Sequence, residues 1–156
     1  MAEVTIRPMR EDDREAVIAI LKQWNMAPVP VSPAVPDPET TGLAADGTTL
    51  VAVAGGSIIG VASFIEHAGA KAETVSLAVD RSWRGAGIGA ELQWARLNEM
   101  KSRGIRQVLT ETDRPEVVQW YIRKFGYRVA GTRRKQHAFS LPDVDHWTVL
   151  ELSLRD

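Results

Sequence analysis

The alternation of apolar and polar residues predicts strands in several short stretches of the chain. The first runs from Val4 to Ile6, and two β-rich runs occupy residues 50–54 and 58–65. Between these two runs lies Gly55-Gly56-Ser57, whose glycines allow the positive φ angles of a tight turn. The two runs are therefore expected to form an antiparallel hairpin. Further strands are expected at residues 74–79, 107–110, 127–132 and 146–154.

A period of about 3.6 residues predicts helices elsewhere. One follows Asp12, which with Glu15 three residues later resembles a helix-start box, and its buried stripe contains Val17, Ile20, Leu21 and Trp24. A second helix covers residues 87–103, with two adjoining apolar lines that contain Ile88, Leu92, Ala95, Trp94, Leu97 and Met100.

A third helix is expected between Asp113 and Gly126. Asp113 is followed three residues later by Glu116, with Pro115 in the first turn, and Gly126 suits a C-terminal cap. Earlier in the chain, five prolines between Pro28 and Pro38 predict an extended loop, either a surface connector or a cover over a site.

The composition is that of a globular protein, with 44% hydrophobic and 25% charged residues in a chain of 156. One compact domain over residues 1–156 is the default at this length. The order of the elements predicts an α/β (α+β) fold with a mixed, mostly antiparallel central sheet flanked by helices.

The charges nearly balance, because Lys plus Arg number 19 and Asp plus Glu number 20. No broad field attracts nucleic acid or anionic lipid, so neither a nucleic acid nor a membrane is an expected partner. The chain has no cysteine, which excludes disulfides, thiolate metal sites and a cysteine acyl-enzyme. Residues 1–10 lack the apolar core of a signal peptide, and no apolar run approaches the roughly 20 residues that span a bilayer. We expect a cytoplasmic protein.

The segment Arg84-Gly85-Ala86-Gly87-Ile88-Gly89 lies between a predicted strand and a predicted helix. Its glycines let the backbone approach a ligand closely, and free amides at a helix start favour an anion. Arg84 adds a fixed charge with forked donors. The segment therefore predicts a phosphate-binding site.

Two ligand classes use such a loop. The spacing Gly85-x-Gly87-x-x-Ala90 fits the dinucleotide fingerprint, and Glu111, roughly 20 residues further on, could hold a ribose. However, five residues, Asp80 to Arg84, separate the strand from Gly85, whereas the dinucleotide turn normally follows its strand at once. An NAD-type enzyme is therefore the weaker alternative.

The same segment, preceded by Leu77-Ala78-Val79 on a strand, matches Arg/Gln-x-x-Gly-x-Gly/Ala and resembles the GNAT superfamily of N-acetyltransferases. The resemblance runs from about Val4 to Leu154 and extends to the order of strands and helices. It implies that acetyl-CoA donates an acetyl group directly to an amine acceptor, a small molecule or a peptide. It also implies that main-chain groups beside Leu77, Ala78 and Val79 bind the pantetheine arm. The diphosphate would then be held by Arg84, Gly85, Ala86, Gly87, Ile88, Gly89 and Ala90.

Direct attack needs a base that takes a proton from the acceptor ammonium. Glu73 is the candidate, because it lies six residues before Val79, where histone-type members of the family carry their glutamate. Burial beside Val75 is expected to raise its pKa. Alternatively, Glu73 is an exposed residue at a strand end, and the base is one that acts through water, namely Glu66, His67 or Glu111.

Tyr121 is the candidate acid for the departing sulfur. Counted back from Gly126, the tyrosine position of the family falls on Ile122, and the common Asn is absent around Arg114 and Pro115. A bulge or a shifted last turn would restore the position of Tyr121; otherwise it is a core or rim aromatic. These departures leave a non-catalytic module that senses CoA as the alternative function.

The remaining signals are weaker. The three histidines, His67, His137 and His146, are scattered, and no metal site is expected. The basic run Arg133-Arg134-Lys135 could reach an acidic substrate or a CoA phosphate, but a solvated face is the expected reading. At least two of Trp24, Trp120 and Trp147 are expected to pack in the core, and one of them could line an acceptor pocket. The implied partners are acetyl-CoA and the amine, and a homodimer is compatible with the sequence.

Overall fold

The computed structural model describes residues 3–24, 26, 47–135 and 140–154. The proline-rich stretch from Pro28 to Pro38 lies outside these residues, and so does His137. Within the described ranges, no helix combines the length and the apolar character needed to cross a membrane.

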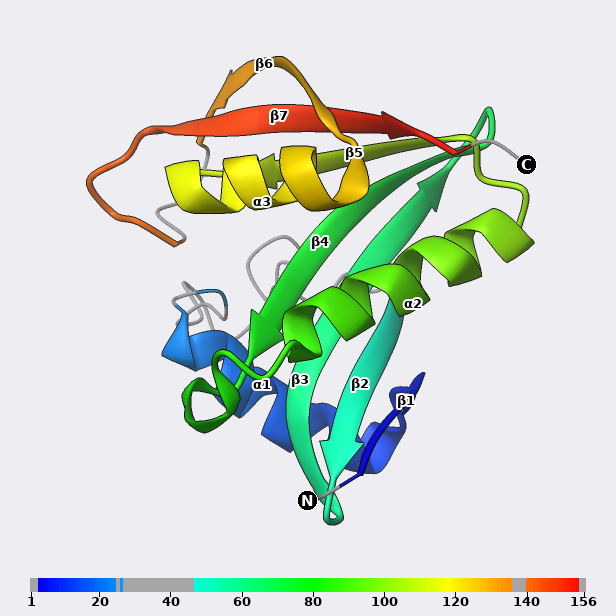
Figure 1. The fold of residues 1–156 in the computed structure, drawn as a ribbon, viewed down its shortest axis with the longest axis vertical. Coiled ribbons are helices and arrows are strands. Elements are labelled where there is room, and N and C mark those ends of the chain that lie inside the picture. The colour runs from blue at the N-terminus through cyan, green and yellow to red at the C-terminus, as the bar shows by residue number, and fades with distance from the viewer. Residues whose placement is uncertain (1–2, 25, 27–46, 136–139, 155–156) are drawn as a thin grey trace, which may run out of the picture.

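In the described chain, seven strands form one sheet in the order β1-β2-β3-β4-β5-β7-β6 (Figure 1). Neighbouring strands are antiparallel except β4 and β5, which are parallel. The predicted mixed, mostly antiparallel sheet with flanking helices is confirmed. The strands are β1 (Val4–Pro8), β2 (Thr48–Ala54), β3 (Ser57–His67), β4 (Lys71–Val79), β5 (Gln107–Thr112), β6 (Arg128–Arg134) and β7 (His146–Ser153).

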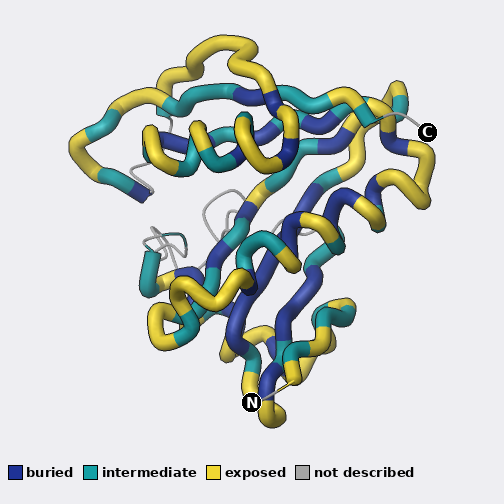
Figure 2. Tube along the Cα trace, viewed as in Figure 1, coloured by how far each residue is buried: buried dark blue, intermediate teal, exposed yellow. Residues whose placement is uncertain are grey.

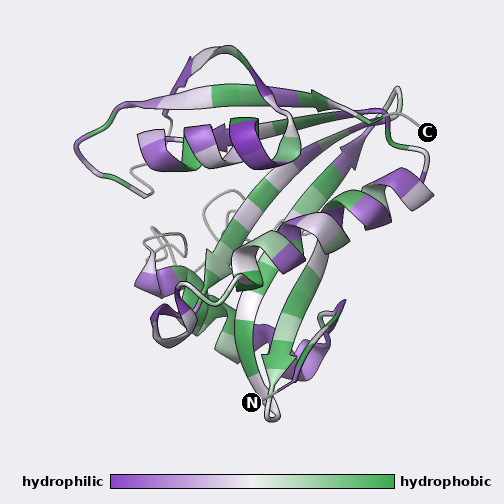
Figure 3. Ribbon diagram, viewed as in Figure 1, coloured by the Kyte–Doolittle hydropathy of each residue, from purple (hydrophilic) through white to green (hydrophobic). Residues whose placement is uncertain are grey.

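Helices cover both faces of this sheet. Helix α1 packs against Val51 and Val61, whereas α2 packs against Ala52 and Ala62, the next residues along the same strands. Because successive strand residues point to opposite faces, α1 and α2 lie on opposite sides of the sheet (Figure 1). Strands β2 and β3 between them are largely buried and apolar (Figures 2 and 3). The helices are α1 (Arg14–Gln23), α2 (Ile88–Ser102) and α3 (Pro115–Phe125).

The predicted hairpin is confirmed at the turn between β2 and β3. Gly55 and Gly56 have φ angles of 57° and 81°, in the left-handed region where a side chain is strained. Ala54 pairs with Ser57 across this two-residue turn.

Strands β4 and β5 pair over a short distance and then separate. The pairing joins residues 71–73 of β4 to residues 107–109 of β5. Just beyond it, the hydroxyl oxygens of Thr74 and Thr110 lie 2.8 Å apart. From there the two strands diverge (Figure 1), and the candidate site lies in the space between them.

Strand β4 also contains a bulge that alternation did not predict. Ser76 pairs with Ser63 and Thr74 pairs with Phe64, so Val75 is an extra residue opposite β3. Val75 is 36% exposed. The side chain of Glu73 is 34% exposed, so the expected burial of Glu73 beside Val75 is wrong.

The helix-start box predicted at Asp12 is also wrong. Helix α1 follows a short 3-10 turn, Glu11–Asp13, and the carboxylate of Asp13 caps this turn, whereas it makes no cap bond to α1 itself. Asp13 Oδ2 accepts the backbone N–H of Arg10 at 2.7 Å and pairs with Arg7 Nη1 at 2.6 Å. The ion pair ties the start of α1 to strand β1.

Candidate active site

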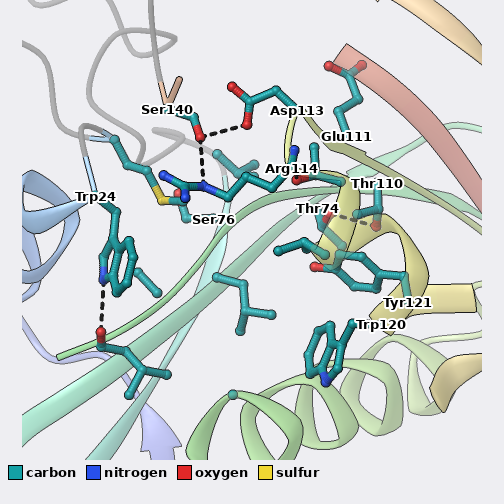
Figure 4. Close-up of a pocket in the computed structure, with 18 of the residues that line it drawn as sticks. Trp24, Thr74, Ser76, Thr110, Glu111, Asp113, Arg114, Trp120, Tyr121 and Ser140 are labelled. Atoms are coloured by element: carbon teal, nitrogen blue, oxygen red, sulfur yellow. Dashed lines mark hydrogen bonds between the residues drawn. The ribbon is translucent and has the colours of Figure 1, made fainter. Parts of the chain in front are cut away.

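A cavity of about 550 Å³ opens where β4 and β5 separate. Its walls come from β4, the start of α2, the end of β5 and one side of α3 (Figure 4). Trp24, Ser140 and Trp147 complete the lining from distant parts of the sequence. The cavity therefore joins the glycine-containing loop to the polar residues at the end of β5.

The predicted phosphate-binding loop connects β4 to α2. A 3-10 turn, Arg81–Trp83, follows β4, and α2 begins at Ile88. Gly85 and Gly87 have φ angles of 83° and 80°, and a Cβ on either would meet no atom within 4 Å. These angles favour glycine, and the first N–H groups of α2 have no acceptor within the helix. The first turn of α2 thus supplies backbone donors, whereas the N–H of Ala86 in the loop donates to the carbonyl of Trp83 at 3.4 Å.

The residues predicted to bind CoA fall into three groups. Those that line the cavity are Leu77, Ala78, Val79, Arg84 and Gly89. The exposed loop beside it contains Gly85, Ala86 and Gly87. The side chain of Ile88 is buried in the core, and Ala90 packs against the core, so both offer a ligand only main-chain groups.

Trp24 fixes one wall of the cavity and gathers positive charge. Its Nε1 donates to the carbonyl of Val79 at 2.9 Å. The guanidinium carbons of Arg81, Arg84 and Arg114 lie 4.6, 5.6 and 5.8 Å from its ring centroid. Such cation–π contacts hold arginines over an indole face. In a chain with net charge −1, this is a local excess of cations.

Tyr121 lines the cavity from α3 and is 4% exposed. Its hydroxyl oxygen accepts an N–H of Arg96 at 3.3 Å, which leaves its own proton free for another acceptor. At the end of α3, the backbone N–H of Tyr127 donates to the carbonyl oxygen of Tyr121 at 3.3 Å. Despite its offset from the position typical of the family, Tyr121 therefore reaches the cavity.

Arg96 is a fully buried cation on α2 that sequence reasoning missed. Its Nη1 donates to the carbonyls of Ser63 at 3.1 Å and Ser76 at 2.9 Å, and its Nε donates to Gln93 at 2.9 Å. Ser63 and Ser76 pair beside the bulge in β4. Arg96 thus connects α2, the bulge and Tyr121.

A signal for Arg96 was present in the sequence. Ile88, Leu92, Arg96 and Met100 recur every four residues and are all buried. The apolar line that included Trp94 was wrong in part, because Trp94 is 48% exposed.

Two carboxylates near the end of the β4–β5 pairing differ in their access to the cavity. Glu111 lines it, whereas Glu73 is not among the described lining residues. Burial raises the pKa of Glu111, the ion pair with Arg133 at 2.8 Å opposes this shift, and the charge of Glu73 adds to it. Glu73 Oε2 lies 3.2 Å from His67 Nε2. Glu111 is therefore the better-placed carboxylate.

Asp113 is a buried structural anion rather than the predicted helix cap. Its carboxylate accepts from Lys135 Nζ at 2.6 Å, Ser140 Oγ at 2.7 Å and the N–H of Leu141 at 2.8 Å. Burial alone raises the pKa of Asp113, but the hydrogen bonds outweigh it, so the pKa is lowered. The prediction of a solvated basic run is wrong for Lys135, whose side chain is 5% exposed.

The three tryptophans considered in the sequence analysis contribute to the core, to the cavity lining, or to both. Trp24 and Trp120 pack against the core, as expected, and both also line the cavity together with Trp147. In the described part of the chain, no cluster of three or more His, Asp or Glu residues could hold a metal ion.

Solved structures of acetyltransferases have the same fold. Ribosomal-protein-S18-alanine N-acetyltransferase from Escherichia coli matches with a TM-score of 0.78 and 17% identity, over 99% of this chain and 96% of that chain. Ard1 from Thermoplasma volcanium gives a TM-score of 0.74 and 19% identity, over 98% and 99% of the two chains. IAA acetyltransferase from Bacillus cereus ATCC 14579 matches with a TM-score of 0.71 and 22% identity, over 97% of this chain and 100% of that chain. At these identities the likeness shows the fold alone.

Sequence comparison identifies the family. No curated protein matches the chain. The family model described as Acetyltransferase (GNAT) family matches residues 10–127, which is more than half of the chain. The chain therefore belongs to the GNAT family of acetyltransferases.

Proposed function

We propose that the protein is an acetyl-CoA-dependent N-acetyltransferase that acts, as one catalytic domain, on a primary amine of a small molecule or peptide. Membership of the GNAT family supports acetyl transfer in general. One observation carries the finer proposal. A single cavity is lined by Arg84 and Gly89 of the loop and by Glu111 and Tyr121, the residues suited to proton transfer.

The described residues fit acetyl-CoA. Gly85 and Gly87 have open space where a Cβ would lie, and Arg84 supplies an exposed cation beside the cavity. Arg84 and the main chain of residues 85–90 would hold the diphosphate, because backbone N–H groups at a helix start favour phosphate. The main chain of Leu77 to Val79 would hold the pantetheine arm. Acetyl-CoA supplies an acyl group that is activated as a thioester.

The site must assist two proton movements. A base takes one proton from the acceptor ammonium, and the neutral nitrogen then bonds to the acyl carbon. The carbon–sulfur bond breaks, the sulfur leaves as a thiolate that takes up a proton, and the nitrogen releases its second proton to water. We assign the first proton to Glu111, through a water, because it lines the cavity and burial raises its pKa. In this proposal Glu73, the base expected from the sequence, acts through its charge on Glu111.

We assign the second proton to Tyr121. Arg96 donates to the oxygen of its hydroxyl, so the hydroxyl proton is available to the sulfur. After the transfer, the negative charge on the oxygen would lie next to a guanidinium in a buried environment, which stabilises it.

The test is a panel of primary amines, amino acids and short peptides, each incubated with the protein and acetyl-CoA while release of the CoA thiol is recorded. The expected result is release with at least one class of amine, accompanied by the acetylated product in the mass spectrum. Tight binding of acetyl-CoA without thiol release from any amine would favour the CoA-sensing module instead. Binding of NAD(H) in place of CoA would favour a dinucleotide enzyme.

A further inference from the structure

Arg114 lies in the cavity but has no place in the chemistry described so far. It connects β5 to α3, and because Pro115 follows, its backbone is held extended, with φ −103° and ψ 114°. From there the side chain extends across the cavity toward Trp24 (Figure 4). Its guanidinium carbon lies 5.8 Å from the indole centroid.

One edge of this guanidinium is fixed by a hydroxyl. Arg114 Nε donates to Ser140 Oγ at 3.3 Å, and Ser140 Oγ donates to Asp113 Oδ1 at 2.7 Å. Within the described residues, the terminal Nη atoms of Arg114 donate to no acceptor. Arg114 therefore offers the cavity up to four N–H groups, held in a plane by the contact at Nε.

Two of the three carboxylates within three residues of Arg114 in the sequence are engaged with other cations. Asp113 accepts from Lys135 Nζ at 2.6 Å, and Glu111 pairs with Arg133 at 2.8 Å. Glu116 lines the cavity but forms no ion pair with Arg114 in the described part of the chain. The charge of Arg114 is thus not neutralised by a described carboxylate.

The surroundings make an unpaired cation costly. Trp24, Met26 and Trp147 line the cavity and lower the local polarity. A half-buried guanidinium with unmet donors is unfavourable in such a place, and an anion with two oxygens would satisfy it with two parallel hydrogen bonds.

We propose that the acceptor amine also carries an anionic group, with an α-amino acid as the simplest example, and that Arg114 binds this group. The inference rests on the proposed function and names its substrate class. Glu111 attracts the ammonium before deprotonation and Arg114 attracts the carboxylate. Opposite charges three residues apart in the sequence therefore orient a zwitterion in one direction within the cavity.

The experiment compares matched acceptors with and without a carboxylate: phenylalanine against 2-phenylethylamine, and leucine against 3-methylbutylamine. Phenylalanine amide is a third probe, since it keeps the carbonyl but not the charge. With acetyl-CoA saturating, kcat/KM of the wild type is expected to be about 10- to 100-fold higher for the carboxylated member of each pair. Equal kcat/KM values for the two members of each pair would overturn the proposal.

Variants assign the preference to Arg114. Arg114→Gln is expected to abolish it, mainly through KM of the acceptor, while the Kd of CoA stays within about twofold of wild type. Arg114→Lys is expected to keep part of the preference, because it keeps the charge but loses the fork. Arg123→Gln, an exposed arginine on α3 outside the cavity lining, is the control. A tenfold loss of CoA affinity in Arg114→Gln would assign Arg114 to the CoA phosphates instead.

A binding measurement separates failure of this inference from failure of the proposed function. Calorimetry on the CoA-saturated protein compares N-acetylphenylalanine with N-acetyl-2-phenylethylamine, which differ in the carboxylate. Tighter binding of the first, lost in Arg114→Gln, supports the anion site even if no amine is acetylated. Equal Kd values for the two compounds overturn it even if amines are acetylated.

Discussion

Arg96 of α2 donates from Nη2 to the hydroxyl oxygen of Tyr121 of α3, across 3.3 Å. Both residues are buried. The contact links the helix that starts at the glycine-containing loop to the helix that carries the candidate acid. Because Arg96 also binds the carbonyls of Ser63 and Ser76 beside the bulge, one cation positions the tyrosine and the irregular part of β4 together.

Replacing Tyr121 by Phe is expected to lower kcat about 100-fold or more, because the ring packing remains while the proton donor is lost. The Kd of acetyl-CoA is expected to change little. Steady-state kinetics and calorimetry check the two quantities. Tyr127→Phe is the matched control, since its ring lies 5.0 Å from that of Tyr121 but Tyr127 is not among the described lining residues, and its hydroxyl accepts from Gln93 and Thr110. Equal losses in both variants would argue against Tyr121 as the acid.

Arg96→Met is expected to lower the free energy of unfolding by about 2–4 kcal/mol, because it removes the buried hydrogen bonds from Arg96 to the carbonyls of Ser63 and Ser76 and to Gln93. Urea denaturation at neutral pH measures this quantity. Lys101→Met, an exposed change on the same helix, is expected to stay within about 0.5 kcal/mol of wild type. A similarly small change in Arg96→Met would mean that the buried contacts contribute no net stability.

Glu111→Gln is expected to reduce kcat/KM most near neutral pH, where the acceptor is mainly an ammonium ion that needs a base. The deficit should shrink toward about pH 10, where free amine is abundant. A pH series of wild type and variant checks this trend. A ratio of wild type to variant that stays constant across the series would exclude Glu111 as the base.

Glu73→Gln is expected to have a smaller effect of a different kind. The charge of Glu73 raises the pKa of Glu111, so its removal lowers that pKa and moves the acid limb of kcat/KM to lower pH. The same pH series measures the shift. A larger loss of activity than in Glu111→Gln would return the role of base to Glu73.

Arg84→Glu is expected to raise the Kd of CoA about tenfold or more, because it places a negative charge against the diphosphate. Calorimetry at two salt concentrations measures the change, which should diminish at high salt. Arg123→Glu reverses an exposed charge away from the cavity and serves as the control. Unchanged affinity in Arg84→Glu would remove Arg84 from the CoA site.

Asp13 gives a prediction about acid stability. Hydrogen bonds from Arg7 and then from the amide of Arg10 lower its pKa to about 2. A depressed carboxyl pKa stabilises the fold above the unfolded pKa of about 4, and this contribution is lost as the pH falls through the folded pKa. Asp13→Asn should therefore lower Tm by a few degrees near neutral pH, and the difference should shrink between about pH 4 and pH 2. Asp12→Asn, its exposed neighbour, is expected to leave Tm unchanged over the whole range.

Much of the fold could be predicted where short-range sequence determines the backbone. Gly55-Gly56 specifies its hairpin, and the stripe of α1 is buried at Val17, Ile20 and Leu21 as expected. The bulge at Val75 could not be predicted, because it depends on the register with β3. Asp113 has the local pattern of a helix cap, but its contacts with Lys135 and Leu141 determine its place instead.

In the candidate site, too, the features set by local sequence could be predicted, and those set by contacts between distant residues could not. The loop from Arg84 to Gly89 was found because its glycines constrain the backbone locally, and Gly85 and Gly87 do adopt positive φ. Arg96 was not predicted, because the buried lines of this helix were assigned from apolar residues alone, although its spacing places it between Leu92 and Met100. The role of Arg114 was not predicted: the sequence showed only that the common Asn is absent around Arg114 and Pro115, and the approach of Arg114 to Trp24 depends on contacts between distant segments.

The narrow junction between β4 and β5 divides the sheet into two panels, β1–β4 and β5–β7. Strands β4 and β5 pair only between residues 71–73 and 107–109. Strands β3 and β4, by contrast, pair along β3 from Gly60 to His67. A ligand bound in the cavity would contact both parts of the sheet and hold them together where β4 and β5 pair only briefly. Occupancy of the cavity should then slow amide hydrogen exchange in both panels at once, even in strands that the ligand does not touch.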